Sequence, residues 1–293
     1  MLTIKKARKA IMGAQILADG ELLASYNGRA PDECLVALKL VQGNPDEFIQ
    51  LVFDELSKSH LFSEYFGPLV KIRLRQQGYL ASPLIGVLFD EPNPIEARLQ
   101  RIRENGVSGL EYLKREYRHV SKSPDKGDET DKVARDLLAE ILVIDFLVQL
   151  NFSNITRPFS KDQPHIDVLA MKDEQYYAIE ITRKQEVDNW KTIEFGNLED
   201  CSHQDNLDKI RSVLRNALWK KNGQFSRAVA AGTIISNSLK VVAIKTSDYG
   251  FAECIDQAKN ILEDLILDPK LEYIDCVWVI PNIDPTSSEW LCI

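Results

Sequence analysis

HIDVLAMKDEQYYAIEITRKQ, the segment from His165 to Gln185, has the pattern of a β-hairpin that carries two carboxylates on facing strands. Lys172–Gln175 is a polar turn between two runs rich in β-branched and aromatic residues. If the hairpin closes symmetrically about this turn, Asp167 lies directly opposite Glu180. Like charges in that position destabilise a sheet, so the presence of the pair indicates that these residues have a functional role. A hard divalent cation would bind the carboxylate oxygens and remove the repulsion.

The two faces of this hairpin differ in polarity when Met171 is paired with Tyr176. One face is predicted to be apolar apart from one tyrosine hydroxyl, and it holds Ile166, Val168, Ala170, Tyr177, Ile179 and Ile181. The other face is polar and holds His165, Asp167, Glu180, Thr182 and Lys184. The alternative interpretation is a surface hairpin whose two acids are solvated on an open face.

A third carboxylate lies upstream, within the predicted helix Ala134–Asn151, ARDLLAEILVIDFLVQLN. At about 100° per residue, Glu140 falls on the face that also holds Leu137, Val143, Ile144 and Leu147. A carboxylate on an apolar face needs a partner or a metal ion. The alternative is an ordinary ion pair with a nearby base such as Arg135 or Lys132, or a side chain that reaches solvent.

The order of helix glutamate, strand aspartate and strand glutamate resembles the PD-(D/E)XK nuclease superfamily, over about half of the chain, Asp131–Pro281. The resemblance implies an α/β (α+β overall) fold: a restriction-endonuclease-like mixed sheet with an αβββαβ core, flanked by helices. The residue pattern before it predicts a mainly helical N-terminal region. It implies Mg²⁺ (or Mn²⁺) bound by Asp167, Glu180 and Glu140. It implies catalytic roles for Glu140, Asp167, Glu180, Lys184 and Gln185.

Two positions depart from the family pattern. The family has a proline directly before the aspartate, whereas Pro164 lies three residues before Asp167. Thr182 occupies the position of the lysine in E-x-K. Lys184 lies two residues further on and therefore on the same strand face. We expect its flexible stem to supply the missing ammonium.

The expected function is therefore a Mg²⁺-dependent nuclease that hydrolyses DNA phosphodiester bonds, an endodeoxyribonuclease with a role in anti-phage defence or restriction. The alternative is a catalytically inactive nuclease-like fold that serves as a nucleic-acid-binding or assembly module. The missing E-x-K lysine and the net charge of −8 motivate this alternative.

The predicted helix 204–221 supplies the candidates for phosphate contact: Lys209, Arg211, Arg215, Lys220 and Lys221. They spread over much of the helix circumference, so a solvated basic face is the alternative. A net charge of −8 is unusual for a protein that grips nucleic acid alone. It predicts a small basic groove assisted by a protein partner or by a homo-oligomer.

Three regions follow from the polarity of the chain. Residues 1–120 are predicted to form a helical recognition or partner domain, with helices at 31–41, 45–56, 61–77, 95–105 and 107–119. The segment 121–131, SKSPDKGDETD, contains no apolar residue and predicts a linker. Residues 132–293 are predicted to form the nuclease-like domain, with strands at 153–158, 240–245 and 276–280 and helices at 204–221 and 252–267. Basic side chains of the first region are expected to select the substrate or partner: Arg73, Arg75, Arg98, Arg101, Arg103, Lys114, Arg115 and Arg118.

Composition narrows the class of protein. Hydrophobic residues make up 44% and charged residues 27% of the 293 residues, as in ordinary globular proteins. No apolar run approaches the ~20 residues of a membrane span. The five cysteines are scattered and form no C-x-x-C pair, which disfavours a disulfide framework or a zinc site. A reducing cytoplasmic location is expected.

Overall fold

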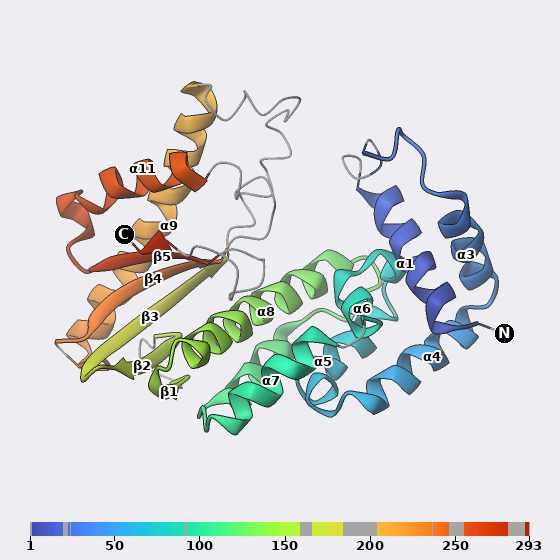
Figure 1. The fold of residues 1–293 in the computed structure, drawn as a ribbon, viewed down its shortest axis with the longest axis horizontal. Coiled ribbons are helices and arrows are strands. Elements are labelled where there is room, and N and C mark those ends of the chain that lie inside the picture. Colours follow the sequence, from blue (N-terminus) through green and yellow to red (C-terminus); the bar gives the residue numbers. More distant parts are fainter. Residues whose placement is uncertain are drawn as a thin grey trace. The chain divides into compact units, whose positions relative to one another are not determined.

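The computed structural model describes residues 2–19, 23, 25–90, 93–158, 166–183, 204–235, 237–245, 255–280 and 291–292. Within these ranges the chain is a mixed α and β protein that divides into two compact units (Figure 1). Unit 1 contains residues 1–104 and 111–138, and unit 2 contains residues 105–110 and 139–293.

Unit 1 is built from helices, as the sequence predicted for the N-terminal region. Their starts follow ordinary capping chemistry: the side chain of Thr3 accepts a hydrogen bond from the Lys6 amide, and Pro45 occupies the first turn of its helix. The elements are α1 (Ile4–Ala18), α3 (Asp32–Gly43), α4 (Pro45–Lys58), α5 (His60–Arg73), η1 (Tyr79–Ala81), α6 (Pro83–Leu88), α7 (Pro94–Glu104), η2 (Leu110–His119) and the first half of α8 (Gly127–Gln149).

Aromatic side chains form the centre of unit 1. Phe48, Phe62, Phe66 and Phe89 are among its largest fully buried side chains. The rings of Phe62 and Phe66 stack at a centroid distance of 4.9 Å, and those of Phe48 and Phe89 lie 6.0 Å apart. The apolar stripes of α4 and α5 are therefore ordinary core.

A buried ion pair holds the beginning of α8 in unit 1. Arg73 Nε donates to Asp131 Oδ2 at 3.0 Å, and the Ser82 hydroxyl donates to Asp131 Oδ1 at 2.5 Å. Because α8 begins at Gly127 and Asp131 is buried, the predicted linker over 121–131 is wrong for its second half. The structure also places the division between the units within α8, after Leu138, and not before it.

Residues 105–110 join unit 2 because they run beside its first strand. Ser108 forms a parallel bridge with Thr156, the Ser108 amide donates to the Ile155 carbonyl, and the Arg157 amide donates to the Ser108 carbonyl. Gly109 has a φ of +80°, and a Cβ there would lie 2.0 Å from the Arg157 carbonyl oxygen. Glycine is thus the residue that this close approach requires.

The strands of unit 2 form one sheet in the order β1-β2-β3-β4-β5-β6. The pairs β1/β2, β2/β3 and β5/β6 are antiparallel, whereas β3/β4 and β4/β5 are parallel. Helices α9 (Gln204–Ala230) and α11 (Ile255–Ile266) connect the parallel strands, and a short η5 (Pro269–Leu271) precedes β5. The strands are β1 (Ser153–Thr156), β2 (Val168–Lys172), β3 (Gln175–Arg183), β4 (Leu239–Lys245), β5 (Cys276–Ile280) and β6 (Leu291–Cys292).

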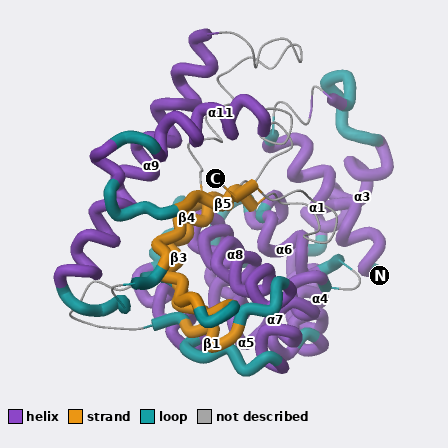
Figure 2. The backbone as a smooth tube through the Cα atoms, turned by 60° about the vertical axis from the view of Figure 1, so that its left-hand side comes forward, coloured by secondary structure: helices purple, strands orange, loops and turns teal. Residues whose placement is uncertain are grey.

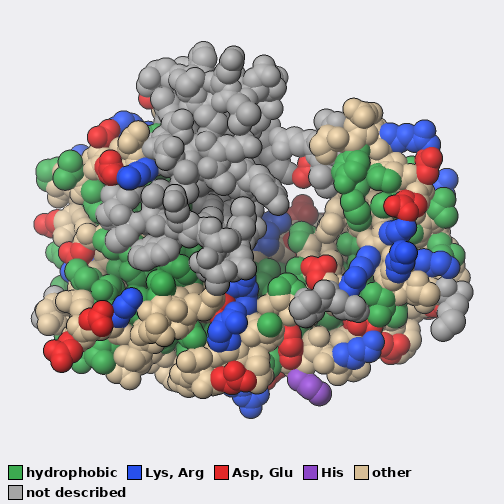
Figure 3. Space-filling model, in the orientation of Figure 1, with side chains coloured by type: hydrophobic (Ala, Val, Ile, Leu, Met, Phe, Trp, Pro, Cys, Tyr) green, Lys and Arg blue, Asp and Glu red, His purple; other side chains and the backbone are tan. Residues whose placement is uncertain are grey.

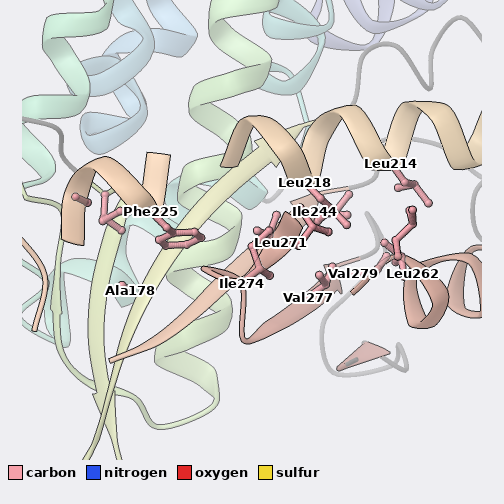
Figure 4. Packing of buried hydrophobic residues seen from close by; sticks show 14 of the residues in the cluster. Ala178, Leu214, Leu218, Phe225, Ile244, Leu262, Leu271, Ile274, Val277 and Val279 are labelled. Carbon is pink, nitrogen blue, oxygen red and sulfur yellow. The ribbon is translucent and has the colours of Figure 1, made fainter. Parts of the chain in front are cut away.

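Helices cover both faces of this sheet (Figure 2). On one face, α9 and α11 pack against the strands through a cluster of buried apolar residues (Figure 4) that includes Leu218, Phe225, Ala178, Ile244 and Val277. The second half of α8 lies along the other face (Figure 1), where Phe152 contacts the rings of Tyr177 and Trp278 at 5.0 and 6.0 Å.

The expected mixed sheet flanked by helices is thus observed, and the elements from α8 to β4 follow the predicted αβββαβ order. None of the described helices is both long enough and apolar enough to span a lipid bilayer.

Candidate functional site

The hairpin β2–β3 has the register that its sequence predicted. Met171 pairs with Tyr176 and Val168 pairs with Ile179, so the next positions along the two strands are Asp167 and Glu180. The two turn residues, Asp173 and Glu174, have φ values of +50° and +65°. Positive φ at both central positions is the geometry whose twist matches that of the flanking strands.

Glu180 lies on the face of β3 that α9 covers. It shares this face with Ala178 of the apolar cluster and pairs with Val242 on β4, which belongs to the same cluster. Its side chain is 0% exposed. The alternative of a solvated acid on an open hairpin is therefore wrong for Glu180. Ile166 also departs from its predicted face, because it joins the α9 cluster.

Lys221 of α9 supplies the cation that faces these acids. Its Nζ donates to Glu180 Oε2 at 2.7 Å and lies 3.4 Å from Asp167 Oδ2. The prediction of Lys221 as a surface phosphate contact is therefore corrected, because the residue is buried. The three residues Asp167, Glu180 and Lys221 are called the acid–lysine cluster below.

Lys221 could have been recognised from the apolar spacing of α9. The helix buries Leu214, Leu218, Phe225 and Ala228, and Lys221 falls between the second and third of these at the same alternation of four and three residues. A lysine in such a stripe points at the sheet, because residues three and four apart share a helix face.

Burial governs the electrostatics of the cluster. Removal from water, and after it the nearby charge of Asp167, raise the pKa of Glu180 from 4.5 to about 8, although Lys221 opposes both effects. The pKa of Lys221 is lowered by burial, but the two carboxylates outweigh this effect and raise it above the ordinary value. At neutral pH the cluster therefore holds a proton on Glu180 beside the charged lysine.

Asp167 is the most solvent-exposed member of the cluster, because its side chain is 22% exposed compared with 11% for Lys221. Asp167 Oδ2 accepts a hydrogen bond of 2.7 Å from the Ile181 amide, which fixes the carboxylate at the edge of β3. Glu180 Oε1 is buried and has no hydrogen-bond partner among the described residues. An unpaired buried oxygen beside a second carboxylate is suited to receive a proton or a cation.

Glu140 has a different partner from the one that the family resemblance implied. Its Oε2 accepts a hydrogen bond of 2.7 Å from Arg157 Nε, and both side chains are largely buried. Among the described residues, no three or more Asp, Glu, His or Cys side chains form a group that could hold a metal ion. The predicted set of Glu140, Asp167 and Glu180 is therefore not assembled, although the interpretation of Glu140 as an ion-paired acid holds, with Arg157 as the base.

Several predicted site residues lie outside the described ranges, namely His165, Lys184 and Gln185, together with the side chain of Lys209. The remaining basic residues of α9 divide by environment. Arg211 forms an ion pair of 3.0 Å with Asp264, Arg215 lies beside the Trp219 ring, and Lys220 is exposed.

The basic residues of unit 1 do not all reach the surface either. Arg73 is buried in its pair with Asp131, and Lys114 pairs with Glu64, whereas Arg75 and Arg103 are exposed. Over the face shown in Figure 3, positive and negative side chains are interspersed on both units.

The geometry thus brings Asp167, just before β2, together with Glu180 of β3 and Lys221 of α9 in one buried cluster that is open to solvent at the aspartate. This arrangement can exchange a proton, neutralise an anion or bind a cation. No protein-family model matches this chain, and no curated protein or solved structure was found to be similar to it.

Proposed function

We propose that the chain is a Mg²⁺-dependent nuclease that hydrolyses phosphodiester bonds, with DNA as the expected substrate, and that the acid–lysine cluster is its active centre. The observation that carries the proposal is the position of Lys221 Nζ, 2.7 Å from Glu180 Oε2 and 3.4 Å from Asp167 Oδ2. Two carboxylates and one ammonium are the residue types of the D…E-x-K pattern. Here the ammonium comes from a helix, in place of Thr182.

The donor set fits a magnesium ion. Mg²⁺ is usually held by one or two carboxylates, with waters and substrate phosphates completing the octahedron. Asp167 and Glu180 would hold it, and the buried Glu180 Oε1 that lacks a hydrogen-bond partner among the described residues supports this assignment. When bound, the ion supplies Lewis-acid polarisation of a phosphate oxygen.

Each side chain of the cluster has a separate task in this proposal. Glu180 must release its proton when the ion binds, so binding is favoured as the pH rises toward about 8. Asp167 is oriented by the Ile181 amide and is the member that solvent and substrate reach first. Lys221 uses two of its three N–H donors on the acids, and the third can stabilise negative charge that develops on the phosphate.

A second candidate function follows from the burial of Glu180. A carboxyl group that is 0% exposed and hydrogen-bonded to Lys221 can also serve only to hold α9 against the sheet. In that case the chain is a nuclease-like module that binds nucleic acid or another protein without cutting. A role in anti-phage defence or restriction belongs to the first candidate, in which strands are cut.

The test is incubation of the purified protein with plasmid, linear and single-stranded DNA and with RNA, in Mg²⁺, Mn²⁺ or EDTA. We expect cleavage that requires a divalent ion and is lost in Asp167→Asn. The matched control is Asp173→Asn at the exposed turn of the same hairpin, which should cut like wild type. Absence of divalent-dependent cleavage on every substrate would overturn the first candidate in favour of the second, as would cleavage by Asp167→Asn at the rate of the control.

A further inference from the structure

The outer face of α9, opposite the acid–lysine cluster, carries an exposed aromatic ring among cations. Trp219 is 44% exposed, in contrast to the fully buried Leu218 beside it. Arg215 lies one turn earlier on the helix, with its guanidinium carbon 6.0 Å from the centre of the Trp219 ring. The next residue, Lys220, is also exposed.

The turn η5 brings a further cation to the same ring. Asn222 Nδ2 donates to the Lys270 carbonyl at 2.9 Å, and Asn222 Oδ1 accepts from the Tyr273 amide at 2.9 Å. These two hydrogen bonds fix the turn against α9. As a result Lys270 Nζ lies 5.9 Å from the centre of the Trp219 ring.

The residues Arg215, Trp219, Lys220 and Lys270 are called the tryptophan patch. The cations of Arg215 and Lys270 both lie near the outer limit of a cation–π contact, about 6 Å, so neither closes tightly over the ring. Asp264 pairs with Arg211 at 3.0 Å, and Asp268 accepts a hydrogen bond of 3.0 Å from the Lys270 amide. The patch therefore offers one exposed aromatic ring beside two cations.

We propose that the tryptophan patch binds single-stranded nucleic acid, with an unpaired base stacked on Trp219 and the adjoining phosphates on Arg215, Lys220 and Lys270. A duplex does not offer this contact, because its base faces are already stacked, whereas single strands bind to aromatic side chains in positive surroundings. The inference rests on the proposed function in taking nucleic acid as the ligand of this chain.

The test is binding of a fluorescent oligothymidylate of about 15 nucleotides, within the usual site size of single-strand binders, measured by anisotropy in EDTA. We expect Trp219→Leu to weaken binding by about 5- to 150-fold, since stacking contributes about that factor per base. The dependence of affinity on salt should not change in this variant. The matched control is Tyr176→Leu, which removes another exposed aromatic ring, 40% exposed, from the hairpin of unit 2. It should bind like wild type.

The cations give a second readout. Arg215→Ala and Lys270→Ala should each make the slope of log affinity against log salt concentration shallower, by about 0.7 for each phosphate that the variant no longer binds. Equal binding by wild type and Trp219→Leu would overturn the proposal, as would tighter binding of a duplex than of the single strand. A smaller sedimenting species in Trp219→Leu would also overturn it, because the patch would then be an interface between copies of the chain.

Binding in EDTA does not depend on hydrolysis, so the two proposals can fail separately. Divalent-dependent cleavage together with unchanged binding by Trp219→Leu would refute the role of the tryptophan patch and support the nuclease. Binding that depends on Trp219, without cleavage of any substrate, would refute the nuclease and support a single-strand-binding module.

Discussion

Glu180→Gln should change the dependence of stability on pH, because it replaces a buried acid with a neutral side chain of the same shape. The pKa of Glu180 is raised to about 8 in the folded chain and is 4.5 when the residue is solvated. Between these two values the folded state holds a proton that the unfolded state has released. With respect to this group, wild type is therefore most stable below about pH 4.5, and it loses this stability progressively as the pH rises from about 4.5 to about 8.

The size of the effect follows from the difference between the two pKa values. At about 1.4 kcal/mol per pKa unit, the rise corresponds to a loss of about 5 kcal/mol across the whole window, as an upper value. Glu180→Gln cannot ionise and should lose none of it. We expect the variant to be close to wild type at pH 5 and more stable by several kcal/mol at pH 9.

Urea unfolding at pH 5 to 9 in EDTA, followed by tryptophan fluorescence, measures this difference. All four tryptophans lie in the residue range of unit 2, so the signal reports on the unit that contains Glu180. Glu174→Gln, at the exposed turn of the same hairpin, is the matched control and should keep the wild-type dependence. Parallel curves for wild type and Glu180→Gln would refute the reasoning, because they would mean that Glu180 ionises normally in the folded chain.

Three further changes test other parts of the structure. Arg157→Met removes the ion pair that Arg157 forms with the largely buried Glu140, and urea unfolding should show a loss of about 3–5 kcal/mol. An unchanged midpoint would mean that this pair contributes nothing to stability. Gly109→Ala places a Cβ 2.0 Å from the Arg157 carbonyl oxygen at a φ of +80°, so calorimetry should show a melting temperature lower by several degrees, corresponding to more than about 1 kcal/mol. Glu174→Gly relieves a φ of +65° in the hairpin turn and should raise the melting temperature by an amount that corresponds to about 1 kcal/mol; a lower melting temperature would contradict the turn geometry.

Local patterns in the sequence predicted the hairpin and most elements of unit 2. The register of β2 and β3 follows from the polar turn at Asp173 and Glu174 and from the alternation of side chains, both of which act over a few residues. The strand 276–280 and the starts of α4 and α9 were predicted at the residues where they occur. These features depend on propensity and periodicity, which a single sequence records.

Long-range ion pairs were not predicted, and they account for the corrections. Arg73 and Asp131 are 58 residues apart, and their pair turns a polar segment that resembles a linker into the beginning of α8. Glu140 and Arg157 are 17 residues apart on different elements. Lys221 is 41 residues from Glu180, but the spacing of the apolar residues in α9 alone places Lys221 on the buried face of that helix. A charged residue at a regular apolar position therefore indicates a partner on the sheet more reliably than the total charge of its helix does.

The most direct test of the central claim is the Mg²⁺-dependent rate of nucleic-acid cleavage by Lys221→Met. The matched control is Lys240→Met, which removes a lysine from another ion pair of the same sheet, 2.9 Å from Asp275. Thermal melts establish that both variants are folded at the assay temperature. If the acid–lysine cluster is the active centre, wild type and Lys240→Met cut at similar rates, and Lys221→Met is slower by about a hundredfold or more. Cleavage by folded Lys221→Met at the wild-type rate would contradict the account and reduce the cluster to a structural ion pair.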